Sequence, residues 1–303
     1  MSGGARDELI DGATLRQLQR LRLRDLDAIV RGLLGETAAG VGSGGRGLEF
    51  SDYRPYAPGD DLRRIDWNVY ARLRQPFVRT SPQERELGLA LLLDGSRSMG
   101  DAGAPVRRHA ERLAALLGSI ALLRGALVQV TVLADGDGRS GEPLTGEQHV
   151  PALLHQLDAL PRGRATDLAA GVRARRPLAS GAEVAALLTD ALVPREQLDA
   201  ALDALHGADA ATLLHVTEPV ASGGLDRAGG PVELVDRETG QTLALELDRR
   251  ALAAHAEAVE RHAATVVARC RAHGVGYVRL PAGGDAFEQV ARLADAQELL
   301  ARG

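Results

Sequence analysis

Residues 87–98 read LGLALLLDGSRS, and this stretch decides how the rest of the chain is interpreted. Leu87 to Leu93 form a continuous apolar run, which is typical of a central parallel strand buried on both faces. The run stops at Asp94, where a polar turn containing glycine begins. Because ligands of open α/β sheets bind beyond the carboxyl ends of the strands, this turn is a candidate functional site.

Downstream of this strand, extended and helical patterns alternate. This rhythm predicts an α/β domain over 87–303 with a doubly wound, mostly parallel sheet. An Asp/Gly turn region follows residue 134. Two short strands around ETGQ interrupt the order and predict an inserted β-hairpin near 231–247. The other strands are predicted at 127–134, 183–189, 212–216 and 275–280, and the helices at 107–123, 150–160, 168–175, 194–205, 248–272 and 285–300.

Upstream of the strand, the sequence predicts an N-terminal extension in three parts. Residues 1–34 form an amphipathic helix, 35–46 a glycine-rich linker, and 47–86 a segment that contains the only tryptophan. The apolar stripe of the helix consists of Leu15, Leu18, Leu26, Ile29, Val30 and Leu33.

The 47–86 segment interleaves arginines and aspartates around its aromatic residues. Two interpretations remain open from the residues alone. The charges are either a self-satisfied ionic cluster beside a small apolar patch, or a surface that binds a partner. The candidate contact residues of the second interpretation are Arg54, Asp60, Asp61, Arg63, Asp66 and Trp67.

Composition narrows the classes of function. The net charge is −5 and the sequence pI is about 5.9, which argues against general attraction to nucleic acid or an anionic membrane. All 36 basic side chains are arginines, so P-loop, Schiff-base and Ser-Lys chemistry are excluded.

Cysteine content and hydropathy bear on location. Cys270 is the single cysteine, and the N-terminus lacks the pattern of a signal peptide, so we expect a cytoplasmic protein. The most apolar stretch, 113–134, is interrupted by Arg124 and Gly125. It predicts a helix followed by a buried strand rather than a membrane insertion.

Polar side chains gather at the predicted carboxyl edge of the sheet. The loops there carry two carboxylates and three hydroxyls, and oxygen donors of this kind select a hard cation. Mg²⁺ is the expected ion, with Mn²⁺ or Ca²⁺ as alternatives. The five candidate metal ligands are Asp94, Ser96, Ser98, Thr166 and Asp190.

The charge of this set indicates what the ion would do. If one carboxylate acts through water, the neutral hydroxyls leave the cation electrophilic, with an exchangeable position. A carboxylate from a partner protein is a natural ligand for that position.

The order D-x-S-x-S, then threonine, then aspartate resembles the metal-ion-dependent adhesion site of von Willebrand factor A domains. The resemblance implies that the three hydroxyls bind the metal directly and that the two carboxylates act partly through water. Gly163-Arg164 stands where the motif usually has two glycines, which is a departure that concerns the threonine.

A second resemblance covers roughly residues 40–300. The stretch EFSDYRPYAPGDDLRRIDW at 49–67, with LDGSRSM after it, is similar to the bacterial domain of unknown function 58 family. Members resemble companions of MoxR-type AAA+ ATPases. This implies an interaction module without enzymatic activity that works with such an ATPase in the assembly or maturation of other proteins.

Other interpretations of the same residues stay open. Ser98 lies in an elbow-like turn and, with Asp190 and either His215 or His273, is the basis of a serine hydrolase alternative. Its weakness is Ser96, which stands where the elbow motif has glycine. In a purely structural alternative, the two aspartates only cap loops.

A histidine metal site is a further alternative. His255 and His262 lie seven residues apart on one predicted helix, with Glu257 and Glu260 nearby. The H-E-x-x-H spacing is absent, which favours solvated helix residues instead.

Overall fold

The computed structural model describes residues 9–20, 53–55, 77–79, 87–100, 104–134, 137–159, 167–178, 182–218, 230–235 and 241–300, and the structural statements below concern these residues. The described helices are α1 (Gly12–Arg20), α6 (Pro105–Leu123), α7 (Val150–Asp158), α8 (Leu168–Ala174), α9 (Arg195–Ala204), α10 (Arg249–Ala272) and α11 (Ala286–Leu300), with 3-10 turns at Glu147–His149 and Leu205–Gly207. The described strands are β1 (Tyr53–Pro55), β2 (Phe77–Arg79), β3 (Leu87–Asp94), β4 (Leu127–Ala134), β5 (Asp137–Ser140), β6 (Leu144–Thr145), β7 (Ala182–Thr189), β8 (Ala210–Thr217), β9 (Gly230–Val235), β10 (Thr242–Leu247) and β11 (Gly276–Pro281).

A seven-stranded sheet forms the centre of the domain. Its strand order is β11-β8-β7-β3-β4-β5, and β6 also pairs with β4. The five long strands run parallel, whereas β5 and β6 are antiparallel to β4. An α/β fold with a mostly parallel sheet, as the sequence predicts, is therefore confirmed.

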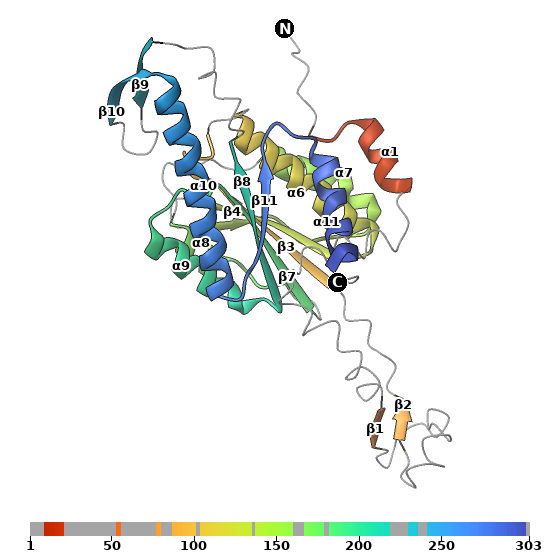
Figure 1. The fold of residues 1–303 in the computed structure, drawn as a ribbon. Coiled ribbons are helices and arrows are strands. Elements are labelled where there is room, and N and C mark those ends of the chain that lie inside the picture. Colours follow the sequence, from red (N-terminus) through yellow and green to blue (C-terminus); the bar gives the residue numbers. More distant parts are fainter. Residues whose placement is uncertain are drawn as a thin grey trace.

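Helices cover both faces of the sheet (Figure 1). Strand β3 shows why, because its side chains alternate between two apolar clusters. Leu91 belongs to the cluster beneath α6, α7 and α11, whereas Leu92 belongs to the cluster beneath α8, α9 and α10. Both leucines are completely buried. A strand enclosed in this way has to be apolar on both faces, which explains the uninterrupted run at 87–93.

Helix α1 packs against the same face as α6. Leu18 is 1% exposed and shares the cluster of Leu113 and Leu117. The other residues of the predicted 1–34 stripe, from Leu26 to Leu33, lie outside the described residues, as does the predicted linker at 35–46.

Two small antiparallel pairs accompany the sheet. Strands β1 and β2 pair in the 47–86 segment, with Arg54 opposite Val78. Strands β9 and β10 form the predicted hairpin, with Leu234 opposite Leu243.

The prediction missed the antiparallel edge of the sheet. Residues 137–140, which the sequence indicates as part of a turn region, form β5 beside β4. Their sequence, DGRS, lacks the apolar alternation of a half-buried strand. Close packing positions it instead, because a Cβ at Gly138 would lie 2.6 Å from the carbonyl oxygen of Gly171 in α8.

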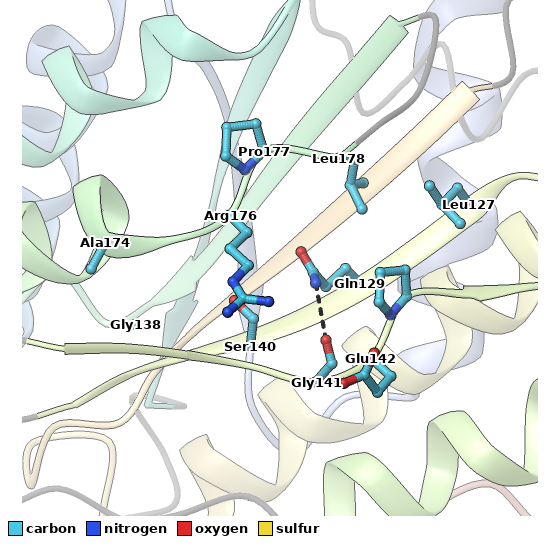
Figure 2. A pocket seen from close by; sticks show the side chains of 11 residues that line it. Leu127, Gln129, Gly138, Ser140, Gly141, Glu142, Ala174, Arg176, Pro177 and Leu178 are labelled. Carbon is cyan, nitrogen blue, oxygen red and sulfur yellow. Dashed lines mark hydrogen bonds between the residues drawn. The ribbon is translucent and has the colours of Figure 1, made fainter.

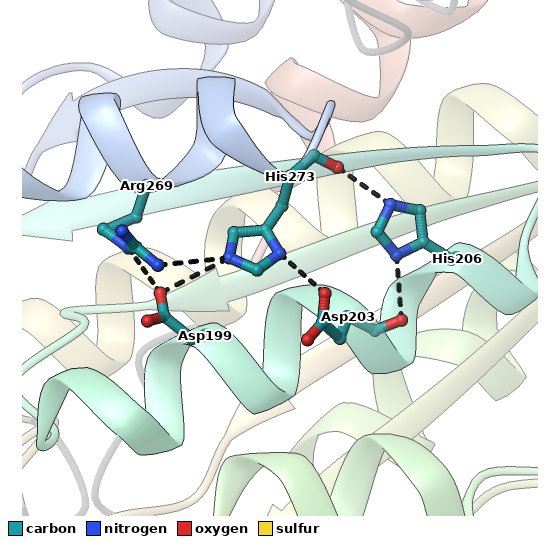
Figure 3. A network of polar contacts seen from close by, with 5 residues as sticks. All are labelled: Asp199, Asp203, His206, Arg269 and His273. Atoms are coloured by element: carbon teal, nitrogen blue, oxygen red, sulfur yellow. Dashed lines mark hydrogen bonds and ion pairs between the residues drawn. The ribbon is translucent and has the colours of Figure 1, made fainter.

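A polar network fastens the end of α10 to α9 (Figure 3). Arg269 donates from Nε to Asp199 over 2.5 Å, and His273 Nδ1 lies 2.7 Å from Asp203 Oδ1. His206 closes the network, because its two ring nitrogens lie within 3.0 Å of the main-chain carbonyls of Asp203 and His273. These five residues are called the α9–α10 clamp below.

The helices of the described ranges differ from membrane-spanning helices. None of them combines the length and apolar character that a bilayer span requires.

Candidate functional site

The carboxyl ends of β3 and β7 meet where the direction of chain winding changes. The two strands are parallel neighbours in the register Leu93 to Leu188. Helix α6, which follows β3, packs on one face of the sheet, and α9, which follows β7, packs on the other. Because the two connections leave in opposite directions, the strand ends form a topological switch point, which is where open α/β sheets usually bind their ligands. This edge of the sheet, at the ends of β3 and β7, is called the crevice below.

Asp94 is buried at this crevice, with 3% of its surface exposed. Its Oδ1 accepts a hydrogen bond from the main-chain N–H of Ser96 over 2.8 Å. Its Oδ2 accepts one from the hydroxyl of Thr189, at the end of β7, over 2.6 Å. Two strands therefore fix the orientation of this carboxylate.

The serines of the turn lie beside this carboxylate. Ser96 is buried and Ser98 is half-buried, and their hydroxyl oxygens are 2.8 Å apart. Gly95 makes the turn possible. Its N–H donates to the carbonyl of Leu133 over 2.8 Å, and a Cβ at this position would lie 2.9 Å from the same oxygen.

Asp190 is the first residue of the loop after β7. It is 6% exposed, and its Oδ1 accepts a hydrogen bond from the N–H of Leu192 over 3.0 Å. The next residue, Ala191, has φ of 54°, a left-handed conformation that is unfavourable for a side chain with a Cβ. Thr189 supports this turn, because its hydroxyl oxygen accepts from the N–H of Ala191 over 2.9 Å.

Two histidines hold the main-chain carbonyl of Asp190. His215 Nε2 lies 3.0 Å from that oxygen, and His262 Nε2 lies 3.4 Å from it. Burial, followed by the nearby His262, lowers the pKa of His215 to about 4, so this ring is neutral near pH 7. Its Nε2–H then donates to the carbonyl, and Nδ1 accepts from the hydroxyl of Tyr277 at 2.9 Å. Burial raises the pKa of Tyr277 to about 12, which keeps that hydroxyl protonated.

The structure brings four of the five predicted ligand residues to one edge of the sheet. Asp94, Ser96, Ser98 and Asp190 all lie at the ends of β3 and β7. Thr166 lies outside the described residues, as do Asp60, Asp61, Arg63, Asp66 and Trp67 of the predicted contact surface. Arg54 lies in β1.

The serine hydrolase alternative does not gain a base from its two candidate histidines. The hydroxyl of Ser98 bonds to that of Ser96. His215 is engaged by Asp190 and Tyr277, and His273 belongs to the α9–α10 clamp.

The histidine metal alternative is not assembled either. His262 bonds to the Asp190 carbonyl, whereas Glu260 forms a two-pronged ion pair with Arg279 at 2.8 Å. Within the described ranges, no three His, Cys, Asp or Glu side chains are grouped as metal ligands. The donor set at the crevice is of a different kind, because it joins two carboxylates to hydroxyls.

Sequence reasoning missed the residues that support the site. Thr189 was not among the candidates, and His215 was considered only as a histidine of the serine hydrolase alternative and not as a support of Asp190. The sequence did contain a signal for both residues. Thr189 is the last residue of the strand before Asp190, and His215 is a polar residue in the apolar run LLHV.

A pocket lies on another part of the described structure (Figure 2). It has a volume of about 420 Å³ and lies between β4, β5 and the segment that follows α8. Arg176 extends over it toward Ser140, and Gln129 donates to the carbonyl of Gly141 over 2.9 Å. None of the predicted site residues lines this pocket.

Comparison with known proteins gives one family and several relatives. The family model described as "Protein of unknown function DUF58" matches residues 52–265. The uncharacterized proteins Mb1516 of Mycobacterium bovis and Rv1480 of Mycobacterium tuberculosis are each 28% identical over 286 residues, which cover 92% of this chain and 87% of theirs.

Similar solved structures include BatB from Bacteroides thetaiotaomicron. It has a TM-score of 0.43 and 16% identity, covering 70% of this chain and 99% of its own. An aerotolerance-related membrane protein from Bacteroides fragilis has a TM-score of 0.39 and 15% identity, covering 71% and 99%. The family match spans more than half of the chain and includes most of the stretch at 49–67, so the resemblance read from the sequence is confirmed: the chain belongs to the DUF58 family.

Proposed function

We propose that this protein is an interaction module whose crevice binds a divalent cation and, through it, a carboxylate of a partner protein. In this proposal the domain is von Willebrand factor A-like and the crevice is its metal-ion-dependent adhesion site. Ser96, Ser98 and Thr166 bind the ion directly, and Asp94 and Asp190 act partly through water. Mg²⁺ is the proposed ion, with Mn²⁺ or Ca²⁺ as alternatives.

The observation that carries the proposal is the spacing of the two serine hydroxyls beside a buried carboxylate. The oxygens of Ser96 and Ser98 are 2.8 Å apart. Neighbouring ligands of an octahedral Mg²⁺ at 2.0–2.1 Å lie about 2.9 Å apart, so the two hydroxyls fit adjacent ligand positions without rearrangement. When bound, the cation supplies a Lewis-acidic position that an incoming carboxylate can fill.

The surroundings of the hydroxyls support the same interpretation. Asp94 is held by Ser96 and Thr189 and supplies negative charge close to both serines. Asp190 supplies a second carboxylate from the neighbouring strand. Two carboxylates balance the charge of a divalent ion, and neutral hydroxyls leave it able to attract a third, which is the property an adhesion site needs.

The wider role extends the proposal. We place the protein with a MoxR-type AAA+ ATPase, in the assembly or maturation of other proteins inside the cell. This part rests on the family to which the chain belongs.

The proposal is tested by calorimetric titration of Mg²⁺ and Mn²⁺ into the purified full-length protein. We expect one site, its affinity reduced at least tenfold by Asp94→Ala and by Ser98→Ala. The matched control is Asp158→Ala, an exposed aspartate at the end of α7. Ser98→Ala keeps both carboxylates and their hydrogen bonds, so its result does not depend on whether Asp94→Ala folds. Equal affinity in wild type and both site variants would overturn the proposal in favour of loop capping.

A further inference from the structure

An exposed leucine stands at the rim of the crevice. Within the described part of the chain, Leu192, Val235 and Leu243 are the large apolar side chains that are exposed. Leu192 is 60% exposed, although its N–H bonds to the carboxylate of Asp190. Leaving a leucine in water forgoes the stabilisation that burial would give, and here it does so beside the proposed ligand residues.

The backbone that presents Leu192 is strained. Ala191 is the one described residue other than glycine with a positive φ, and it is 1% exposed. On the other side of Leu192, Val193 packs against the core. Several hydrogen bonds keep the turn in place, from Thr189 within it and from His215 and His262 to the Asp190 carbonyl. Strain that is held by surrounding structure at a site is characteristic of function.

The loop after β3, the strand next to β7, carries a positive charge. Arg97 lies between the two serines and is exposed, and it forms no ion pair with any described residue. A cation held by Ser96 and Ser98 would add to this positive potential. The loop after β3 therefore presents a positive side chain and the loop after the neighbouring strand β7 an apolar one, and these two residues are called the rims of the crevice.

We propose that Arg97 and Leu192 select the partner, which presents an acidic and apolar peptide segment. The central carboxylate of the segment goes to the cation. A second acidic residue pairs with Arg97, and an apolar side chain on the other flank packs on Leu192. This inference rests on the proposed function and adds to it the chemistry of the partner.

The rims favour a peptide over a nucleic acid as the occupant. A nucleic acid would supply phosphates to Arg97, but it calls for several basic groups and aromatic platforms for its bases. The described residues of the two loops, 95–100 and 190–194, include one exposed arginine, Arg97, and one exposed leucine, Leu192, in a chain of net charge −5.

The test selects a library of random linear peptides on the immobilised full-length protein, in Mg²⁺ and in EDTA. We expect enrichment only in Mg²⁺, for peptides in which an acidic residue has an acidic neighbour on one side and Leu, Ile or Phe on the other. The affinity of one enriched fluorescent peptide is then measured for Arg97→Glu and Leu192→Ser. Each variant should bind it about tenfold more weakly, which corresponds to losing one favourable contact.

A repeat of the selection on the variants gives a sharper readout. Arg97→Glu should change the preferred flanking residue from acidic to basic, and Leu192→Ser should remove the apolar preference. The matched control is Arg173→Glu, an exposed arginine on α8, which should leave both preferences unchanged. Both rim residues are exposed, so neither substitution should disturb folding.

The outcomes separate this inference from the proposed function. Enrichment that depends on Mg²⁺ but shows no flanking preference, or that both rim variants leave unchanged, overturns the role of the rims and leaves the cation site standing. An absence of Mg²⁺-dependent enrichment together with an absence of Mg²⁺ binding overturns both.

Discussion

Two polar clusters touch α10, and they differ in how their groups are used. At the α9–α10 clamp, Arg269 lies against Asp199 and His273 lies against Asp203 (Figure 3). At the crevice, the polar groups lie on strand ends, beside the exposed Arg97 and Leu192.

The clamp connects two helices of the domain, whereas the crevice presents exposed side chains next to buried polar groups. In the clamp, Arg269 pairs with Asp199, and the two histidines bond to Asp203 and to main-chain carbonyls, so each of the five residues has a partner within the network. The crevice combines a buried carboxylate, a strained turn and exposed rim residues, features that add nothing to stability by themselves. Substitutions in the clamp should therefore change stability alone, and those in the crevice should change binding. The predictions below test this contrast, from the largest expected effect to the smallest.

Acidification should lower the free energy of unfolding through His215, which supports the crevice. The pKa of this buried ring is about 4, below the 6.5 of an unfolded histidine. The unfolded chain therefore takes up a proton first as the pH falls. The contribution of the neutral His215 ring to the free energy of unfolding is complete above pH 6.5. It is lost between pH 6.5 and 4, by up to about 3 kcal/mol. The measurement is the free energy of unfolding in urea at pH 7.0 and 4.5, in EDTA.

The variant His215→Gln should lose most of this pH dependence, because glutamine does not titrate. His255→Gln, at an exposed position of α10, should keep it. A slope that is identical in wild type and His215→Gln would show that another group is responsible.

Gly95→Ala should disturb both stability and binding. The new Cβ would lie 2.9 Å from the carbonyl oxygen of Leu133, so the turn has to move away from β4. Overpacking of this kind destabilises by about 1–3 kcal/mol. Because Ser96 follows directly, Mg²⁺ affinity measured by calorimetry should fall as well.

The control for that substitution is Gly207→Ala. The nearest atom to its Cβ would be the end of the Arg175 side chain at 3.7 Å, which is ordinary contact. If both alanine variants behave alike, close packing at Gly95 is not what shapes the turn.

Asp199→Asn should destabilise the clamp without affecting the cation. Its hydrogen bond with Arg269 lowers the pKa of Asp199 below 3.8, so the stabilisation is present above about pH 4 and is lost as the pH falls further. The expected loss near neutral pH is about 1 kcal/mol, since both side chains are partly exposed. Thermal unfolding at pH 7 and pH 3 measures it, and the two proteins should converge at the lower pH. Weakened Mg²⁺ binding in this variant would break the contrast drawn above.

Leu192→Ser should have the smallest effect on stability. An exposed side chain contributes little to folding, so the free energy of unfolding should change by no more than about 0.5 kcal/mol. The control is Leu187→Ser, at a completely buried position of β7, which should unfold at much lower denaturant concentration. A large loss for Leu192→Ser would assign that side chain to the core.

Much of the fold was predictable because its signals are local. The apolar run at 127–134 predicts β4 with the bounds that the structure has, and the hairpin was visible from its two strands around ETGQ. Strand β5 was not predictable, because its pairing depends on the approach of α8 rather than on its own residues.

The site divides in the same way. Asp94, Ser96 and Ser98 were chosen as candidates because they lie at or just after the end of one strand, and Asp190 because it directly follows another. The support of Asp190 by His215 and His262 joins elements far apart in the sequence, and the left-handed turn at Ala191 leaves no mark in composition. Those features are properties of the packed structure and become visible only in three dimensions.

The opposite departures of α6 and α9 have a consequence for how the protein can change. The switch point at the ends of β3 and β7 exists because the chain is wound in two directions, and the loop side chains there play no part in creating it. The same scaffold can therefore exchange its loop residues, and with them the chemistry of the candidate site, while the apolar sheet beneath stays as it is. The fold and the residues of the candidate site can therefore change independently of each other, and they meet only at a few residues on two strand ends.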